Sequence, residues 1–384
     1  TVVPSVTLLT GVSNKLDLLH IENEFSDFDR DRLLFYMLSN EGPHLAVKDL
    51  NNDGLEDIVL GGSSGYSTQI AYQQKNGTFV KKEFSVLTQN AVMEDSRILI
   101  EDFNGDGFQD IFVCGGGSEL PNTSTGLKDR LYLGSKNGFI ENPEVFNGQY
   151  NSTSSVVWLD MDADGDKDIF AGGRMEPFNY GIPATSFVYE NINGKYVSSP
   201  SLSAPFRQYG MIVDATGSDI NGDGIAELII LKDLGNVDIF EVQRQGIQNI
   251  TSATGLLNIK GFWTSMRVED IDDDGDFDIM VCNKGLNNRL SSDYDSFEMH
   301  VNDFDGNGQI EQISCYTESS WTFPWVMRDD LVKQLPGLKK RLLKYHEFAA
   351  ADLSTMFDQG VLKNSIVYKT APSLCEAEPQ PTSG

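Results

Sequence analysis

The 384-residue sequence has few of the residues that metalloenzyme sites, redox sites and disulfide frameworks need. It contains four cysteines and four histidines, and it has no H-E-x-x-H, C-x-x-C or P-loop motif. Cys114, Cys282 and Cys315 each lie 12 residues after the start of a similar acidic stretch. Equivalent positions in different repeats favour three separate buried thiols over a disulfide framework. We therefore expect no catalytic residue and no organic cofactor.

Long apolar runs and basic residues are also scarce. No run of 18 apolar residues is present, so the sequence predicts no transmembrane segment. Lys and Arg number 29 against 57 Asp and Glu, and the formal net charge of −28 argues against nucleic acid as a partner. The sequence begins at Thr1 without a signal peptide. We interpret it as a mature or trimmed secreted form; a fragment and a naturally shorter protein are the alternatives.

What the sequence does contain is one acidic loop, repeated six times. Each loop has an acid or amide at positions 1, 3 and 5, glycine at position 6 and an acid at position 9. Ca²⁺ takes roughly six to eight oxygen ligands, which alternate residues of a tight loop can supply. We predict that the loops bind up to six Ca²⁺ ions. The loops begin at Asp49, Asp102, Asp160, Asp219, Asp270 and Asp303.

The candidate calcium ligands are the residues at positions 1, 3, 5, 7 and 9, with Asp166 and Asp276 as the acids at position 7. In chain order they are Asp49, Asn51, Asp53, Leu55, Asp57, Asp102, Asn104, Asp106, Phe108, Asp110, Asp160, Asp162, Asp164, Asp166, Asp168, Asp219, Asn221, Asp223, Ile225, Glu227, Asp270, Asp272, Asp274, Asp276, Asp278, Asp303, Asp305, Asn307, Gln309 and Glu311. Loop six departs most from the pattern, so we expect the weakest site there.

The EF-hand is the nearest alternative to this loop, but the sequence does not fit it. An EF-hand needs a bidentate Glu at position 12 and a helix on each side. The flanks here are short runs rich in Ile and Val, such as residues 45–47 and 58–60, and these are typical of buried strands. Each loop therefore joins two antiparallel strands. Position 12 holds Leu60, Val113, Ala171, Ile230, Val281 and Ser314.

The rest of the repeat adds two more strands. A glycine pair ends the second strand, and an Asn-Gly pair, a strong hairpin signal, follows at Asn76, Asn137 and Asn193. Loop starts are 53, 58, 59, 51 and 33 residues apart. A four-stranded unit of about this length is a β-propeller blade. We expect an all-β, seven-bladed propeller, whose seventh blade combines residues before 45 with C-terminal strands, because closing the ring removes exposed edges.

One stretch breaks the β pattern. Residues 326–363 predict a helical insertion, with helices over 329–335 and 338–348 and a further turn over 353–357. The blades then occupy 1–325, and a returning strand and tail occupy 364–384. The insertion carries a basic cluster, and two interpretations stay open: a solvated helix face that covers a propeller edge, or a docking element for a partner. The cluster comprises Lys339, Lys340, Arg341 and Lys344.

Two further stretches, residues 321–325 and 174–177, have no single predicted role. The aromatic residues of 321–325 either pack between the insertion and its blade or offer a surface for a glycan. Residues 174–177, which follow the glycine pair of the third repeat, receive no role from the sequence. The histidines belong to no acid–base constellation, and we expect them to be structural. They are His20, His44, His300 and His346.

The acidic loops and glycine pairs resemble the FG-GAP or VCBS repeats of integrin-α-type β-propellers. Residues 18–25, 328–336 and 338–340 also resemble segments of large surface proteins of Bacteroidota that are related to the cartilage acidic protein group. The resemblance implies an extracellular, calcium-binding propeller at a cell surface, associated with the bacterial outer membrane. It does not imply a reaction.

These observations predict a non-enzymatic binding or scaffold propeller, stabilised by calcium, in a cell-surface or outer-membrane complex. Its expected partner is a protein, with a glycan as a further possibility. The alternative function is a polysaccharide-binding or polysaccharide lyase-type propeller, because some calcium-rich propellers are lyases.

Overall fold

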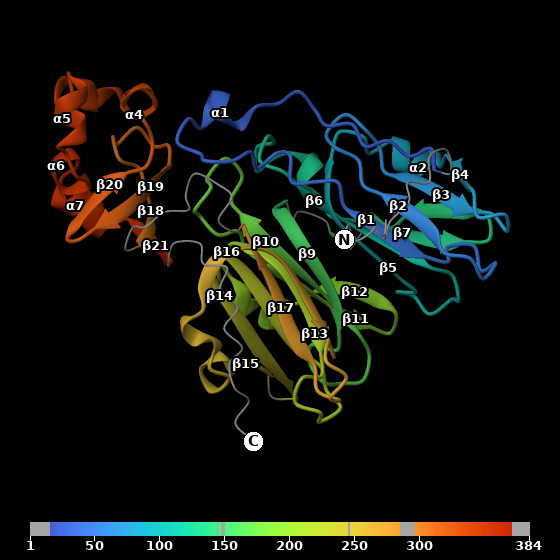
Figure 1. Ribbon diagram of the computed structural model, residues 1–384. Coiled ribbons are helices and arrows are strands. Elements are labelled where there is room, and N and C mark those ends of the chain that lie inside the picture. The colour runs from blue at the N-terminus through green and yellow to red at the C-terminus, as the bar shows by residue number, and fades with distance from the viewer. Residues whose placement is uncertain (1–15, 144, 147–149, 245, 285–295, 371–384) are drawn as a thin grey trace, which may run out of the picture.

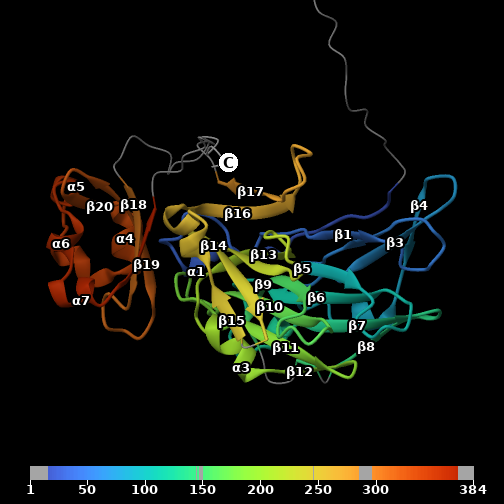
Figure 2. The ribbon, with the colours of Figure 1, turned by 90° about the horizontal axis from the view of Figure 1, so that it is seen from below.

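A computed structural model describes residues 16–143, 145–146, 150–244, 246–284 and 296–370 (Figure 1). These residues form five antiparallel sheets, four of them with four strands and one with five, and only short helices. The all-β class predicted from the sequence is therefore confirmed. The first four sheets pack face to face in the manner of propeller blades, and the first and last sheets lie at opposite ends of the molecule (Figures 1 and 2).

The first three sheets follow the predicted repeat in chain order. Each contains the two strands that flank an acidic loop, then a hairpin closed by an Asn-Gly turn. Their strands are β1 (Leu45–Lys48), β2 (Asp57–Leu60), β3 (Gln69–Gln73) and β4 (Phe79–Lys82); β5 (Glu94–Glu101), β6 (Asp110–Gly116), β7 (Arg130–Ser135) and β8 (Gly138–Glu141); and β9 (Ser152–Leu159), β10 (Asp168–Met175), β11 (Phe187–Ile192) and β12 (Lys195–Ser198).

The fourth sheet combines the hairpins of the fourth and fifth loops. Its longest strand changes partner along its length: residues 227–232 pair with β13, 233–236 with β16 and 240–243 with β15. Two repeats therefore share one sheet, and the structure has fewer sheets than loops. The strands are β13 (Ile212–Ser218), β14 (Glu227–Gln243), β15 (Gly246–Asn249), β16 (Lys260–Glu269) and β17 (Asp278–Asn283).

The fifth sheet carries the sixth loop. Its strand order is β20-β19-β18-β21, so the strand after the insertion returns to pair with β18. The strands are β18 (Ser296–Asn302), β19 (Glu311–Glu318), β20 (Trp321–Pro324) and β21 (Ile366–Thr370).

The predicted count of seven blades is not confirmed by the described residues. Residues 16–44 contain one short helix, α1 (Asp27–Arg30), and no strand. β21 does not begin another sheet, because β18 pairs with β19 on one side and offers its other edge to β21. Pairing there satisfies backbone groups that an open edge would expose.

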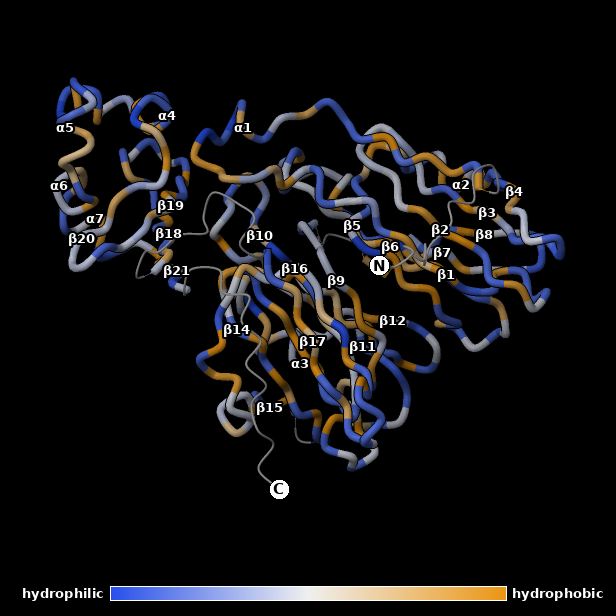
Figure 3. The backbone as a smooth tube through the Cα atoms, viewed as in Figure 1, coloured by the Kyte–Doolittle hydropathy of each residue, from blue (hydrophilic) through white to orange (hydrophobic). Residues whose placement is uncertain are grey.

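The core lies between the sheets, because the central strands are apolar on both faces. Ile111 and Val113 of β6 pack toward the first sheet, whereas Phe112 and Cys114 pack toward the third. This two-residue alternation is the pleat of a β-strand, and both faces are buried, so the sequence shows an uninterrupted apolar run. In Figure 3 the hydrophobic colour concentrates along strands such as β14.

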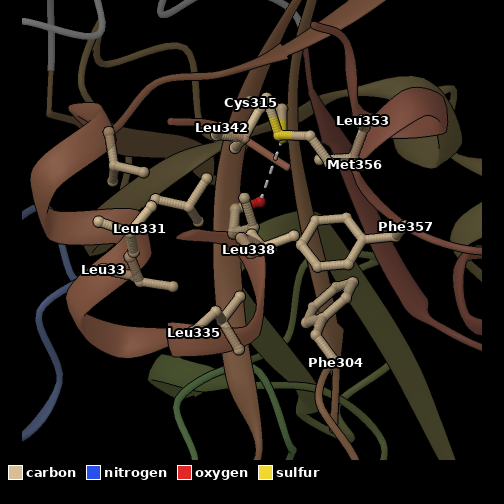
Figure 4. Packing of buried hydrophobic residues seen from close by; sticks show 13 residues of the cluster. Leu33, Phe304, Cys315, Leu331, Leu335, Leu338, Leu342, Leu353, Met356 and Phe357 are labelled. Atoms are coloured by element: carbon tan, nitrogen blue, oxygen red, sulfur yellow. Dashed lines mark hydrogen bonds between the residues drawn. The ribbon is translucent and has the colours of Figure 1, made fainter. Parts of the chain in front are cut away.

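The insertion packs its apolar residues onto the fifth sheet (Figure 4). It consists of α4 (Arg328–Gln334), a 3₁₀ turn (Pro336–Lys340), α5 (Tyr345–Ala349), α6 (Leu353–Met356) and α7 (Gln359–Lys363). The buried cluster joins these segments to the sheet and to the segment before β1. It contains Leu33, Phe304, Ile313, Cys315, Val326, Leu331, Val332, Leu335, Leu338, Leu342, Leu353, Met356 and Phe357.

The predicted helix over residues 338–348 is wrong. The chain forms a 3₁₀ turn first, in which the N–H groups of Arg341 and Leu342 both donate to the Leu338 carbonyl. A new helix then starts at Lys344, whose backbone N–H donates to the Glu347 carboxylate. Burial of both Leu338 and Leu342 determines where the chain turns.

Short helical segments elsewhere connect the strands. They are α2 (Ser85–Thr88), α3 (Pro200–Ser203) and 3₁₀ turns over Thr125–Leu127, Ala204–Phe206, Thr251–Ala253 and Leu256–Asn258.

Three thiols are free, as expected, but one is not buried. Cys114 and Cys315 are buried, whereas Cys282 is exposed. Cys282 lies on β17, where the alternate residues of the outer face have no covering sheet among the described residues. Cys375 lies outside the described residues.

The glycine pair after the second strand provides a test of this packing. A Cβ at Gly62 would lie 2.1 Å from the Tyr66 carbonyl oxygen, which belongs to the backbone and cannot rotate away. We expect Gly62→Ala to destabilise the protein by ~1–3 kcal/mol, measured as a lower melting temperature by circular dichroism. Gly360→Ala is the matched control, because nothing lies within 4 Å of its Cβ position; equal melting temperatures for the two variants would contradict the packing.

Candidate metal loops and a central polar cavity

All six acidic loops join paired antiparallel strands, as predicted. In each loop the carboxylate at position 1 accepts the backbone N–H groups of positions 5 and 6; Asp49, for example, accepts from Asp53 at 3.2 Å and Gly54 at 2.8 Å. Positions 4 and 6 both have positive φ, including non-glycine Ala163 at 58° and Asp273 at 60°. The loops are therefore one structure repeated six times.

The acid at position 9 has a second structural role that the sequence did not indicate. One oxygen accepts the backbone N–H of position 2 in every loop, as Asp110 does from Phe103 at 3.0 Å. In the first three sheets the other oxygen accepts an N–H from the third strand, as Asp110 does from Gly134 at 2.7 Å. This carboxylate thus ties the loop hairpin to the strand that follows it.

The position-9 carboxyls are buried near other acids in every loop except loop five, where Asp278 is exposed. Burial raises the pKa of Asp110 to about 6 and that of Asp168 to about 7; the two backbone N–H donors oppose this rise, and the acids of the same loop add to it. Burial likewise raises the pKa of Glu311 to about 7. A carboxylate in this position is costly without a nearby positive charge.

Loops three, five and six bring three carboxylates within 4.8 Å of one another, from positions 1, 3 and 9. Loops one, two and four have Asn at position 3, which offers an amide oxygen instead. Hard oxygen donors converging from alternate residues fit Ca²⁺. Loop six matches loops three and five in this convergence, so its sequence differences do not disrupt the arrangement. The groups are Asp160, Asp162 and Asp168; Asp270, Asp272 and Asp278; and Asp303, Asp305 and Glu311.

A second candidate site is a cavity of about 310 Å³ where the first strands of the repeats meet. β5, β9, β13 and β16 each carry a register shift, one residue wide, beside this cavity. Such bulges turn a side chain out of the ladder and are frequent next to functional sites. The bulged residues all line the cavity, and residues from the 38–44 segment line it as well. They are Ser96, Ser154, Val213 and Thr264.

Three basic side chains line the cavity: Arg97, Arg174 and Lys284. Arg97 forms an ion pair with Asp214, and so connects β5 with β13 across the intervening β9. Arg174 forms an ion pair with Glu41 and lies 3.3 Å from the Asp233 carboxylate. The sequence analysis assigned no role to residues 174–177. In the structure, Arg174 lines this cavity.

Hydrogen bonding fixes the orientation of His44 at the cavity wall. Its Nδ1 accepts the backbone N–H of Ile98 at 3.1 Å. Burial, with a contribution from the Arg97 charge, lowers the pKa of His44 to about 4, so the ring is neutral and carries its proton on Nε2. This N–H lies 3.1 Å from the Arg97 guanidinium, which is also a donor. The neutral ring has one acceptor nitrogen and two neighbouring donors, so it can accept from only one of them.

The cavity residues occupy equivalent places in the repeats, which is the signal that sequence reasoning missed. Counting from the first Asp of each loop, the bulged residue is six before it, and His44, Arg97 and Asp214 are five before it. Arg174, Asp233 and Lys284 are each 14 after it. Aligning the repeats on their loops would have shown that these positions vary in charge while the loops stay the same.

The fold and loops define a protein built from four-stranded repeats with an acidic hairpin loop in each. A family model described as the FG-GAP-like repeat matches residues 49–113 and 102–171. Integrin alpha-8 of Gallus gallus is 27% identical over 173 residues, a match that covers 41% of this chain and 16% of that protein. Residues 49–171 therefore contain FG-GAP-like repeats, and part of the chain is similar to integrin alpha-8. The resemblance to Bacteroidota surface proteins stays a prediction.

Solved structures with some likeness include AofleA from Arthrobotrys oligospora, with 14% identity, coverage of 76% of this chain and 73% of that chain, and a TM-score of 0.38. The V. cholerae biofilm matrix protein Bap1 has 14% identity, coverage of 75% and 48%, and a TM-score of 0.30. Likeness at these scores carries no functional argument. Within the described residues, every helix is too short or too polar to cross a membrane.

The buried carboxyl of Glu94 at the cavity wall gives a pH-dependent test. Burial raises its pKa from 4.5 to about 8, with added repulsion from Glu119, Glu22 and Asp95. A raised folded-state pKa means that stability is lost as the pH rises from about 4.5 to about 8. Glu94→Gln should remove this loss and raise stability above about pH 8 by up to ~4 kcal/mol, with little effect near pH 4.

Melting curves across this pH range would measure the effect of Glu94→Gln. Exposed Glu83 supplies the control, since Glu83→Gln should leave the pH profile unchanged. A Glu94→Gln profile parallel to that of the unmodified protein would contradict the assignment.

Proposed function

We propose that this protein is a calcium-stabilised, non-enzymatic binding or scaffold module that works outside the cell, in a surface or outer-membrane complex. The observation that carries the proposal is the repetition of one acidic loop geometry at six hairpins. Supporting residues are the carboxylates of positions 1, 3 and 9, which lie within 4.8 Å of one another in loops three, five and six.

Calcium in this proposal has a structural role. Each ion would neutralise clustered carboxylates that otherwise repel one another, and would fix the hairpin against its third strand. Low-affinity oxygen sites suit the calcium concentration outside cells. The integrin-like repeats support an extracellular setting in which proteins are bound.

We expect removal of calcium with EDTA to lower the melting temperature by roughly 10 °C or more, because ions that bind only the folded state stabilise it. Restoring Ca²⁺ should reverse the change. Asp162→Ala, which removes a candidate ligand in loop three, should reduce the calcium-dependent shift. Asp17→Ala is the control, an exposed acid outside the loops. A melting temperature that EDTA leaves unchanged would refute the calcium role.

The insertion is the proposed docking surface for a protein partner. Its buried side packs onto the fifth sheet, while its outer side exposes Lys339, Lys340 and Lys344 in a protein with a net charge of −28. Beside them, Leu343 is 65% exposed and Tyr345 60% exposed. Basic side chains around exposed apolar ones fit an acidic partner surface with a hydrophobic centre.

Reversing the three lysine charges tests this surface without opening the buried cluster that a deletion would expose. Lys339→Glu, Lys340→Glu and Lys344→Glu together should reduce recovery of a partner crosslinked in native membranes by about tenfold. The matched control reverses three exposed lysines on other sheets, namely Lys75, Lys136 and Lys195. Equal recovery by both triple variants would exclude the insertion as the docking surface.

A further inference from the structure

A charged network lies beside the central cavity, and three of its buried polar atoms have no hydrogen-bond partner among the described residues: the Nζ of Lys284, the Nε of Arg174 and one oxygen of Asp233. The Asp233 carboxylate accepts hydrogen bonds from Tyr36 at 2.9 Å, from Tyr180 at 2.7 Å and from Arg174 at 3.3 Å, all at one oxygen. Lys284 lies beside this network, with its ammonium nitrogen 2.8 Å from the centre of the Tyr36 ring. That nitrogen is buried and has no hydrogen-bond partner among the described residues.

Lys284 forms no ion pair of its own among the described residues, and it shares the attraction of the Asp233 carboxylate with Arg174. Arg97 pairs with Asp214, and Arg174 pairs with Glu41 and Asp233. Glu94 contributes little negative charge at neutral pH, because burial raises its pKa to about 8. Burial lowers the pKa of Lys284 to about 7, although the Asp233 charge opposes this change, and an anion bound beside the ammonium would stabilise its charged form.

Further donors face the same space. The Nε–H of Arg174 is buried and has no partner among the residues that the structure describes. His44 lies beside two donors, the backbone N–H of Ile98 and the Arg97 guanidinium, and its neutral ring can accept a hydrogen bond from only one of them. Donors thus converge from β5, from β10, from the residue that follows β17 and from the segment before β1.

Two serines that line the cavity can bind hydroxyl groups of a ligand. Ser96 and Ser154 each donate their hydroxyl hydrogen to a backbone carbonyl, of Thr153 and Ile212 respectively, both at 2.5 Å. Their oxygens keep lone pairs that can accept a hydrogen bond from a ligand. A volume of about 310 Å³ is at the small end of ligand pockets.

We propose that the central cavity binds a small hydroxylated carboxylate, of the size of a hexuronic acid. The carboxylate accepts hydrogen bonds from Lys284 and Arg174, and the hydroxyls of the ligand lie against Ser96 and Ser154. This site is separate from the acidic loops and from the insertion. It adds a small-molecule ligand to a protein whose proposed partners are macromolecular.

Isothermal titration calorimetry on the full chain, in calcium-containing buffer, tests the site with four probes. Sodium glucuronate should bind at one site per chain. Sodium acetate should bind more weakly, because it offers only the carboxylate, and glucose should not bind detectably, because it offers only hydroxyls. No binding of glucuronate, or equal binding of glucose, would overturn the proposal. Sodium sulfate binding as tightly as glucuronate would overturn the assignment of a carboxylate.

Substitution of Lys284 locates the site. Lys284→Gln should weaken glucuronate binding at least about tenfold, since a hydrogen bond to a charged group is lost. Lys284→Arg keeps the charge and should retain more of the affinity. Exposed Lys136 supplies the control, and Lys136→Gln should bind glucuronate as the unmodified protein does. Unchanged binding by Lys284→Gln would overturn the proposal.

Folding of the variants is checked separately by circular dichroism. Lys284→Gln removes the contact between the ammonium and the Tyr36 ring, so its melting curve is compared with that of the unmodified protein before binding is measured. If it fails to fold, Val213→Phe takes its place. It adds volume from a bulged residue that lines the cavity and keeps every charge. Loss of glucuronate binding in Val213→Phe supports the site, and unchanged binding overturns it.

Discussion

The carboxylate at position 9 of each loop is the contact on which the rest of the structure depends. One of its oxygens closes the loop in all six repeats, and in the first three sheets the other holds the third strand. Loop, hairpin and third strand are therefore fixed by a single side chain. In five of the six loops this side chain is buried with other acids nearby, so its charged form is costly unless a positive charge lies beside it, and the proposed Ca²⁺ would provide that charge.

Regular repeats have a consequence at the centre of the molecule. Since the loops hold each hairpin in the same way, the first strands of successive repeats meet with equivalent residues facing one another. The bulges at Ser96, Ser154, Val213 and Thr264 then turn these residues toward one cavity. The charged network of Arg174, Asp233 and Lys284 arises by the same geometry, from one position in three repeats. The regular geometry of the acidic loops thus determines which residues line the central cavity.

Local patterns in the sequence predicted the local structure well. Glycine, Asn-Gly pairs and short Ile-Val runs fix hairpins through the backbone of a few residues, and all six loop hairpins are present. The sheet count and the helix over 338–348 depended on long-range contacts instead. β14 joins two repeats because residues 233–236 find β16 as a partner, and the insertion turns where Leu338 and Leu342 reach the core. Neither Arg174 nor Lys284 stands out in the sequence of its own repeat. Their role depends on the three-dimensional arrangement, which brings equivalent positions of different repeats together.

The residue 14 positions after the start of a loop differs in charge from repeat to repeat, and it can change independently of the loop. A substitution at Arg174, Asp233 or Lys284 alters the cavity and leaves every loop hydrogen bond intact, because these side chains take no part in the loops. New recognition properties can therefore arise at these positions while the loops keep their hydrogen bonds, provided that the buried charges remain paired. A chain built in this way can diversify at its centre while selection on the loops maintains its architecture.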